Sequence, residues 1–182
     1  MEHQALDHDR SEMFNYALFK RFGNNEMGIL GLTVDEQYGG SGILDASAVA
    51  IVHEELSASD PALCLAYLAH SVLFAHNLSM NGTHEQKLKF LPDACSGDRI
   101  GGMCMSEPDA GTDVLGMTTN ARWDEGNKTF ILNGQKMWIT NGTVDGSSTG
   151  DMFLVYAKTG PNRGDITQFL VEKGILFDFV YN

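Results

Sequence analysis

The residues best suited to chemistry lie in one stretch, Cys104-Met105-Ser106-Glu107-Pro108-Asp109-Ala110-Gly111-Thr112-Asp113-Val114-Leu115-Gly116. An apolar, strand-like run leads there into a polar loop that carries the hydroxyl groups of Ser106 and Thr112. Small residues such as Gly111 allow a planar or phosphate-bearing ligand to approach the backbone, whose N–H groups can then bind anionic or carbonyl oxygens. By composition alone, the stretch is equally compatible with an ordinary junction between a strand and a loop.

Two familiar catalytic patterns begin in this sequence and are not completed. The run His53-Glu54-Glu55-Leu56-Ser57 starts like the zinc-protease motif H-E-x-x-H, but a serine stands where the second histidine must bind the metal. The run Gly40-Ser41-Gly42 is followed by Asp45, where a dinucleotide-binding loop requires its third glycine. The sequence therefore predicts no metal site and no nicotinamide-binding domain.

The first half of the chain has the residue periodicity of helices, and this pattern ends between Ser96 and Asp98. The third predicted helix, residues 61–81, is apolar on most sides, which places it in the middle of a bundle. His70 and His76, six residues apart on it, do not share a face and are interpreted as polar groups within the packing. The predicted helices cover residues 11–22, residues 46–59 after an Asp45 cap, residues 61–81 after an Asp60 cap, and a run that starts at a Thr83 capping box and stops near Pro92 or shortly after.

Short β-prone runs separated by Gly, Asn and Asp turns follow this point. Residues 129–132 and 136–140 flank Asn133-Gly134, a pattern that favours a hairpin with a two-residue turn. Residues 152–157 and 166–171 are predicted as further strands.

Composition excludes several classes of partner. The chain has 182 residues, a formal net charge of -12 and a pI near 4.7, which argue against a nucleic-acid partner. Three cysteines without a C-x-x-C pair do not suggest a disulfide framework, so a reducing compartment is expected. The densest apolar run, residues 61–74, is too short to predict a membrane span. The first ten residues show no targeting peptide.

Two blocks of the sequence resemble the acyl-CoA dehydrogenase family. Residues 104–116 are similar to the family signature, through Ser106-Glu107, Gly111-Thr112-Asp113 and Gly116. The second block, residues 133–142, resembles the family's other flavin-contacting segment. Isovaleryl-type and other branched-chain members look most similar. Shorter similarities extend the resemblance over nearly the whole chain, at residues 28–32, 38–40, 53–56, 81–82, 85–87 and 91–92.

The resemblance implies an α+β fold. Residues 1–96 would form an amino-terminal all-α helical bundle domain, and residues 97–182 an incomplete antiparallel β-barrel domain. The family's carboxy-terminal helical domain, which carries the catalytic glutamate, would be absent. No residue here, Glu107 included, is therefore assigned a catalytic role, and the chain alone is not expected to oxidise an acyl-CoA. Residues 174–182 leave the family pattern, as a truncated chain would.

The resemblance also implies FAD as cofactor. Thr112 would contact both the FAD pyrophosphate and the acyl-CoA substrate, Trp138 would pack against the flavin ring, and Thr140 would donate toward its N5 and O4 edge. Such donors would stabilise the charge that builds up on the ring as it accepts a hydride. The cofactor-binding residues implied are Met103, Cys104, Met105, Ser106, Gly111, Thr112, Trp138, Ile139 and Thr140.

The family's habits extend to partners and compartment. An electron-transferring flavoprotein would be the electron acceptor, the full-length protein would be a homo-oligomer, and the location would be the mitochondrial matrix or the bacterial cytoplasm. Two alternatives stay open from the residues. One is a non-catalytic module that binds FAD, CoA or another subunit; the other is a fragment of an acyl-CoA oxidase, which passes its electrons to oxygen.

Overall fold

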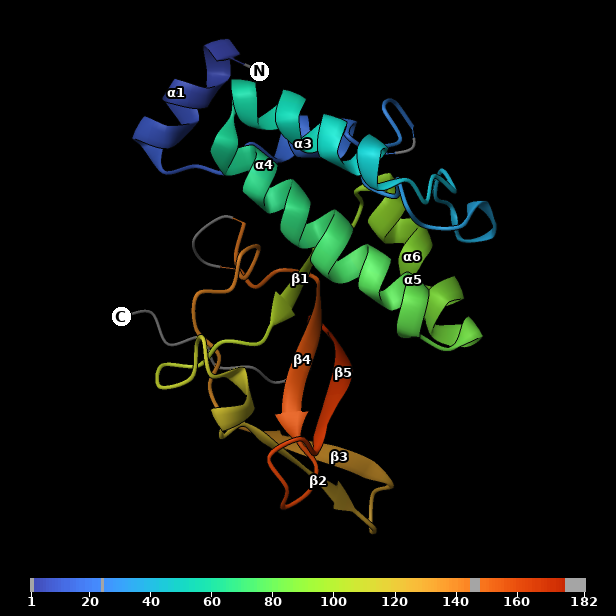
Figure 1. Cartoon of the computed structure of the whole chain (residues 1–182), viewed down its shortest axis with the longest axis vertical. Coiled ribbons are helices and arrows are strands. Elements are labelled where there is room, and N and C mark those ends of the chain that lie inside the picture. Colours follow the sequence, from blue (N-terminus) through green and yellow to red (C-terminus); the bar gives the residue numbers. More distant parts are fainter. Residues whose placement is uncertain (1, 24, 145–147, 176–182) are drawn as a thin grey trace.

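The computed structural model describes residues 2–23, 25–144 and 148–175. Helices occupy one end of the molecule and strands the other (Figure 1). The helices are α1 (Glu2–Ser11), α2 (Tyr16–Arg21), η1 (Glu36–Tyr38), α3 (Ala46–Ser59), α4 (Pro61–Leu68), η2 (Ala69–His76), α5 (Asn77–Asn81), α6 (His84–Ser96) and η3 (Val114–Gly116). The strands are β1 (Gly101–Cys104), β2 (Asn120–Asp124), β3 (Thr129–Asn133), β4 (Met152–Lys158) and β5 (Ile166–Glu172).

Local capping chemistry sets the helix starts that the sequence predicts. Asp45 accepts from the backbone N–H of Ser47 at the start of α3, and Asp60 accepts from that of Leu63 at the start of α4. Thr83 and Gln86 form both hydrogen bonds of a capping box before α6. These three predictions are confirmed.

The Asp60 cap should contribute measurably to stability, because it is buried and satisfies a helix N–H that has no other partner. We expect Asp60→Ala to lower the free energy of unfolding by about 1–2 kcal/mol, as read from urea denaturation. Asp60→Asn keeps the accepting oxygen and is the control; it should stay within a few tenths of a kcal/mol of the parent. An equal loss in both variants would show that the cap bond is not the cause.

The predicted start of the first helix is wrong. The helix predicted over residues 11–22 is the shorter α2, Tyr16–Arg21, because Asn15 caps its start by accepting from the N–H of Leu18; α1 is a separate helix that ends at Ser11. Helix α6 runs through Pro92 to Ser96 and ends at Gly97, which has a left-handed φ of 77°. Burial of Leu91, Ala94 and Cys95 on one face holds that last turn despite the proline.

The central helix runs without a break from α4 through η2 to α5, as Figure 1 shows. Its middle segment, η2, is a π-helix, an element that is rare and that the sequence does not signal. Residues Pro61–Asn81, 21 residues, are long and apolar enough to cross a membrane, and their 18-residue window has a mean hydropathy of 1.3. Because 56% of that window is buried inside the protein, the helix has the environment of a globular core.

The strands form one open, mixed sheet. Strand β4 pairs in parallel with β1 and antiparallel with β5, while β2 and β3 form an antiparallel hairpin that joins β4 through the Asn120–Lys158 bridge. The predicted strands at residues 152–157 and 166–171 are confirmed. The predicted fold class is confirmed as well, except that the sheet is mixed and not purely antiparallel.

The predicted hairpin around Asn133-Gly134 is wrong. Strand β3 pairs with the strand before it, across the turn at residues 125–128, and the chain leaves the sheet after Asn133. Gly134 lies so close to Thr119 that a Cβ there would be 2.3 Å from the Thr119 hydroxyl oxygen. The glycine is therefore explained by close packing and not by a two-residue turn.

The helices and the sheet share one core across their junction. Met152 and Leu154 of β4 belong to the same buried cluster as Phe74 of η2 and Leu91 of α6. Gly101, at the start of β1, crosses η2 so closely that a Cβ would be 2.2 Å from the Phe74 ring. This contact requires glycine and places β1 directly on the central helix.

Both histidines of the central helix are packing groups, as predicted. His70 is fully buried; its Nδ1 accepts from the N–H of Gly101 at 2.9 Å, and its Nε2 donates to the Ala94 carbonyl at 3.0 Å. This pattern is that of a neutral imidazole. His76 is bonded through Nδ1 to the Thr33 hydroxyl at 3.0 Å.

Candidate functional site

Two loops that are about thirty residues apart in sequence meet at the end of β1. We call residues 105–113 the signature loop and residues 134–142 the tryptophan loop. The N–H of Met137 donates to the carbonyl of Ser106 at 3.0 Å, and the Lys136 ammonium donates to the carbonyl of Met105 at 2.9 Å. The two blocks that carry the family resemblance are thus brought side by side.

A buried ion pair joins the loops. The Lys136 ammonium lies 3.0 Å from a Glu107 carboxylate oxygen, and the two side chains are 9% and 3% exposed. Glu107 also accepts from the N–H groups of Thr118 and Thr119, at 2.7 and 3.0 Å, and from the Thr118 hydroxyl at 2.8 Å. Burial opposes ionisation of Glu107, but these hydrogen bonds outweigh it and lower its pKa to about 2. Glu107 is therefore a fixed anion, with its oxygens occupied.

Three predicted site residues lie along β1 and its exit. Met103 and Met105 are partly exposed, whereas Cys104 between them is buried in a cluster with Phe153 and Val155. This alternation is that of a strand, so the Cys104 side chain faces the core. Burial raises the pKa of its thiol to about 12, although the nearby Lys136 charge opposes the shift. The thiol is thus a packing group at neutral pH.

The signature loop turns sharply beyond Glu107. Glu107 and Ala110 exchange both backbone hydrogen bonds, at 2.9 and 3.2 Å, and this turn leads to exposed Gly111 and Thr112. A Cβ at Gly111 would have no heavy atom within 4 Å, so the space in front of this backbone is open. Asp113 is tied to Arg163 in the β4–β5 connection by an exposed ion pair.

The tryptophan loop presents its largest side chain to solvent. Trp138 is 82% exposed and has a left-handed φ of 61°, an unusual conformation for a bulky residue. Ile139 packs against the cluster that contains Cys104. The backbone of Thr140 lies against β1, since a Cβ at Gly102 would be 2.9 Å from the Thr140 carbonyl oxygen.

Sequence reasoning missed two residues that hold this arrangement. The sequence pattern predicts Lys136 as a strand residue and indicates no individual role for Asn141. Asn141 is buried, and its side-chain amide donates to the carbonyls of Ala66 in α4 and Gly101 in β1, at 3.0 and 3.1 Å. A lysine and an asparagine carry no sequence signal of burial; only their location within the resembling block could have drawn attention to them.

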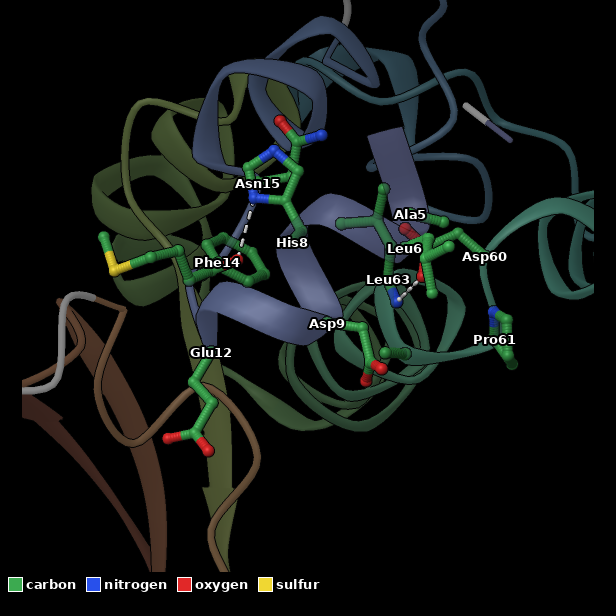
Figure 2. A pocket seen from close by; sticks show the side chains of 12 residues that line it. Ala5, Leu6, His8, Asp9, Glu12, Phe14, Asn15, Asp60, Pro61 and Leu63 are labelled. Carbon is green, nitrogen blue, oxygen red and sulfur yellow. Dashed lines mark hydrogen bonds between the residues drawn. The ribbon is translucent and has the colours of Figure 1, made fainter. Parts of the chain in front are cut away.

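A cavity of about 680 Å³ lies elsewhere, between α1 and the first turn of α4 (Figure 2). It is lined by residues that include Leu6, His8, Glu12, Pro61 and Leu63, and by none of the predicted site residues. Over the residues that the structure describes, no group of three or more His, Cys, Asp or Glu side chains could hold a metal ion.

The geometry fits a flat, partly anionic ligand. An exposed indole, an open glycine backbone and the hydroxyls of Ser106 and Thr112 lie on loops that a buried ion pair holds together. Aromatic faces bind planar rings, and exposed loop N–H groups bind phosphate oxygens.

Comparisons with known proteins identify the family. The amino-terminal domain model of acyl-CoA dehydrogenases matches residues 1–98, and the middle domain model matches residues 102–176. The chain belongs to the acyl-CoA dehydrogenase family.

Individual relatives give the same assignment. Mitochondrial isovaleryl-CoA dehydrogenase of Solanum tuberosum is 43% identical over 92% of this chain and 39% of its own length; that of Pongo abelii is 44% identical over 94% and 40%. The structure of a glutaryl-CoA dehydrogenase from Mycobacterium smegmatis in complex with FADH2 is 32% identical, with a TM-score of 0.82 over 94% of this chain and 41% of that one. The chain thus spans about two-fifths of the length of these relatives.

Proposed function

We propose that these residues form the flavin-binding part of an FAD-dependent acyl-CoA dehydrogenase. The single observation that supports it best is the junction of the two loops, where Met137 and Lys136 bond to the backbone of Ser106 and Met105. Exposed Trp138 directly follows Met137 of this junction, and the backbone of the signature loop is open at Gly111; both features support the proposal. Family membership makes FAD the ligand to test first, because solved relatives contain it.

Five of the proposed site residues have roles that their positions permit. Trp138 would cover one face of the flavin ring, and the Ser106 and Thr140 groups would donate to its polar edge. Thr112, with the open backbone at Gly111, would contact the pyrophosphate and the thioester. When bound, the flavin supplies hydride acceptance at N5, the chemistry of α,β-dehydrogenation.

The general base is proposed to lie outside residues 1–182. A base must be free to take a proton from the substrate. Glu107, the buried acid of the signature loop, is saturated by four donors, and its lowered pKa leaves it a weak base.

The substrate and partners follow from the relatives as proposals. Relatives at 43% and 44% identity are mitochondrial isovaleryl-CoA dehydrogenases, which favours a short, branched acyl-CoA as substrate and branched-chain amino acid catabolism as the setting. We propose an electron-transferring flavoprotein as acceptor and a homo-oligomer as the full-length assembly. Relatives include both mitochondrial and Bacillus subtilis proteins, so the compartment is the matrix or a bacterial cytoplasm.

The test is retention of FAD by the purified 182-residue protein after desalting, read from the flavin band in the visible spectrum. We expect binding with quenched tryptophan emission, and a dissociation constant about tenfold higher or more for Trp138→Ala, because a stacked aromatic ring contributes on the order of 1 kcal/mol or more. Trp123→Phe, at an exposed tryptophan outside the loops, is the control and should leave affinity unchanged. Equal affinity in Trp138→Ala and the parent would contradict the proposed ring contact.

A further inference from the structure

The tryptophan loop holds its exposed side chain in an unfavourable backbone conformation. Trp138 and Asn141 both have left-handed φ values, 61° and 65°; this conformation is unusual for a bulky residue such as Trp138 and more common for asparagine. The Trp138 side chain is 82% exposed, so its own packing cannot compensate for that conformation. The groups that hold the loop must therefore lie on either side of the tryptophan.

The anchor before Trp138 is the Lys136 side chain. It is 9% exposed, and its ammonium lies 3.0 Å from Glu107 and 2.9 Å from the Met105 carbonyl. An unpaired ammonium is costly to bury. The Lys136 ammonium therefore cannot leave its two partners without a large loss of free energy. Lys136 ties the loop to the signature loop.

The anchor after Trp138 is the Asn141 side chain, which bonds to different elements. Its amide donates to the carbonyls of Ala66 in α4 and Gly101 in β1. The loop is therefore fixed to the signature loop on one side and to the helix–strand junction on the other. Between these anchors the N–H of Met137 is also bonded, to Ser106.

We infer that Lys136 and Asn141 are positioning residues that hold the exposed indole of Trp138 at a fixed place beside the signature loop. A ligand then meets an aromatic face that is already ordered, so binding does not have to immobilise it. The identity of this ligand as FAD rests on the proposed function; the positioning of the indole does not.

The test reads the motion of Trp138 directly. A Trp123→Phe background leaves Trp138 as the single tryptophan and keeps an aromatic ring beside Phe130. Time-resolved fluorescence anisotropy then reports nanosecond rotation of the indole. We expect Lys136→Met and Asn141→Gly to increase the amplitude of fast rotation about twofold or more; glycine accepts the left-handed backbone, so only the amide anchor is lost.

The matched control is Lys128→Met. Lys128 also pairs with a glutamate, Glu125, but both side chains are at least 70% exposed, in the turn between β2 and β3. This variant should leave the rotation of Trp138 unchanged. Thermal unfolding of each variant confirms that the chain is folded. If Lys136→Met does not fold, the double variant Glu107→Gln with Lys136→Met removes both buried charges together and takes its place.

Binding of FAD gives the second readout. Loosening either anchor should raise the dissociation constant for FAD about tenfold, because binding must then also immobilise the indole, which costs conformational entropy. If the parent does not bind FAD, the proposed function fails for this chain, while the anisotropy still decides the positioning role. Unchanged rotation of Trp138 in folded anchor variants would overturn the inference, whether or not FAD binds.

Discussion

Replacing Glu107 with alanine should lower the free energy of unfolding by about 3–5 kcal/mol, because it leaves the buried Lys136 ammonium without its counter-charge. Both side chains are nearly inaccessible, so water cannot take the place of the carboxylate. The N–H groups of Thr118 and Thr119 also lose their acceptor. Urea denaturation followed by circular dichroism measures the change.

The Glu125–Lys128 pair provides the control for this prediction. It has the same two residue types, but its side chains are 77% and 70% exposed. Glu125→Ala should therefore change stability by less than about 0.5 kcal/mol. Glu107→Gln, which keeps one acceptor oxygen and loses the charge, should fall between the two alanine variants. Losses of similar size at positions 107 and 125 would contradict a role for burial of the ion pair.

Acid should destabilise the protein in two steps, the first of which comes from His70. Burial lowers the pKa of His70 to about 4, although its hydrogen bond to Ala94 opposes the shift. Below pH 6.5 the unfolded chain binds a proton that the folded chain excludes, so stability is complete above pH 6.5 and falls as the pH drops toward 4. The loss between about pH 7.5 and about pH 5 should be about 2 kcal/mol.

His70→Gln isolates this step. The amide keeps one donor for Ala94 and one acceptor for Gly101 but does not titrate, so the stability difference between the two pH values should largely disappear. The same substitution at exposed His84 should leave the difference intact. A His70→Gln variant with the parent's pH profile would assign the acid sensitivity to another group.

The second step belongs to Glu107 and comes at lower pH. Its folded pKa of about 2 lies below the ordinary 4.5, so its contribution is present above pH 4.5 and is lost as the pH falls toward 2. The pH ranges over which His70 and Glu107 lose their contributions to stability barely overlap. Measurements above pH 5 therefore report the His70 step.

Helix starts were predictable because their causes are local. Asp60 lies one residue before Pro61, and Thr83 lies three residues before Gln86, so each capping partner is within one turn of the other. The ends were less predictable. Helix α6 continues past Pro92 because its buried face packs on the central helix. A short segment of sequence around Pro92 does not reveal this packing.

The wrong prediction of a hairpin at Asn133-Gly134 shows why strand pairing is hard to predict from sequence. Asn133-Gly134 has the composition of a two-residue turn, but strand pairing depends on a partner strand as well as on the turn. Strand β3 already pairs with β2, and the chain after Gly134 is drawn toward the signature loop by Lys136. A long-range ion pair outweighs a local turn preference here.

The sequence by itself determined the family, the two blocks that carry the site, and the helix caps, since all three depend on residue identity at short spacing. Only the tertiary structure decided that the side chain of Cys104 faces the core, that Glu107 is a buried anion, and that Lys136 and Asn141 hold Trp138 in the open. These features depend on which distant groups enter the same low-dielectric space, and burial of that kind is set by packing across the whole chain.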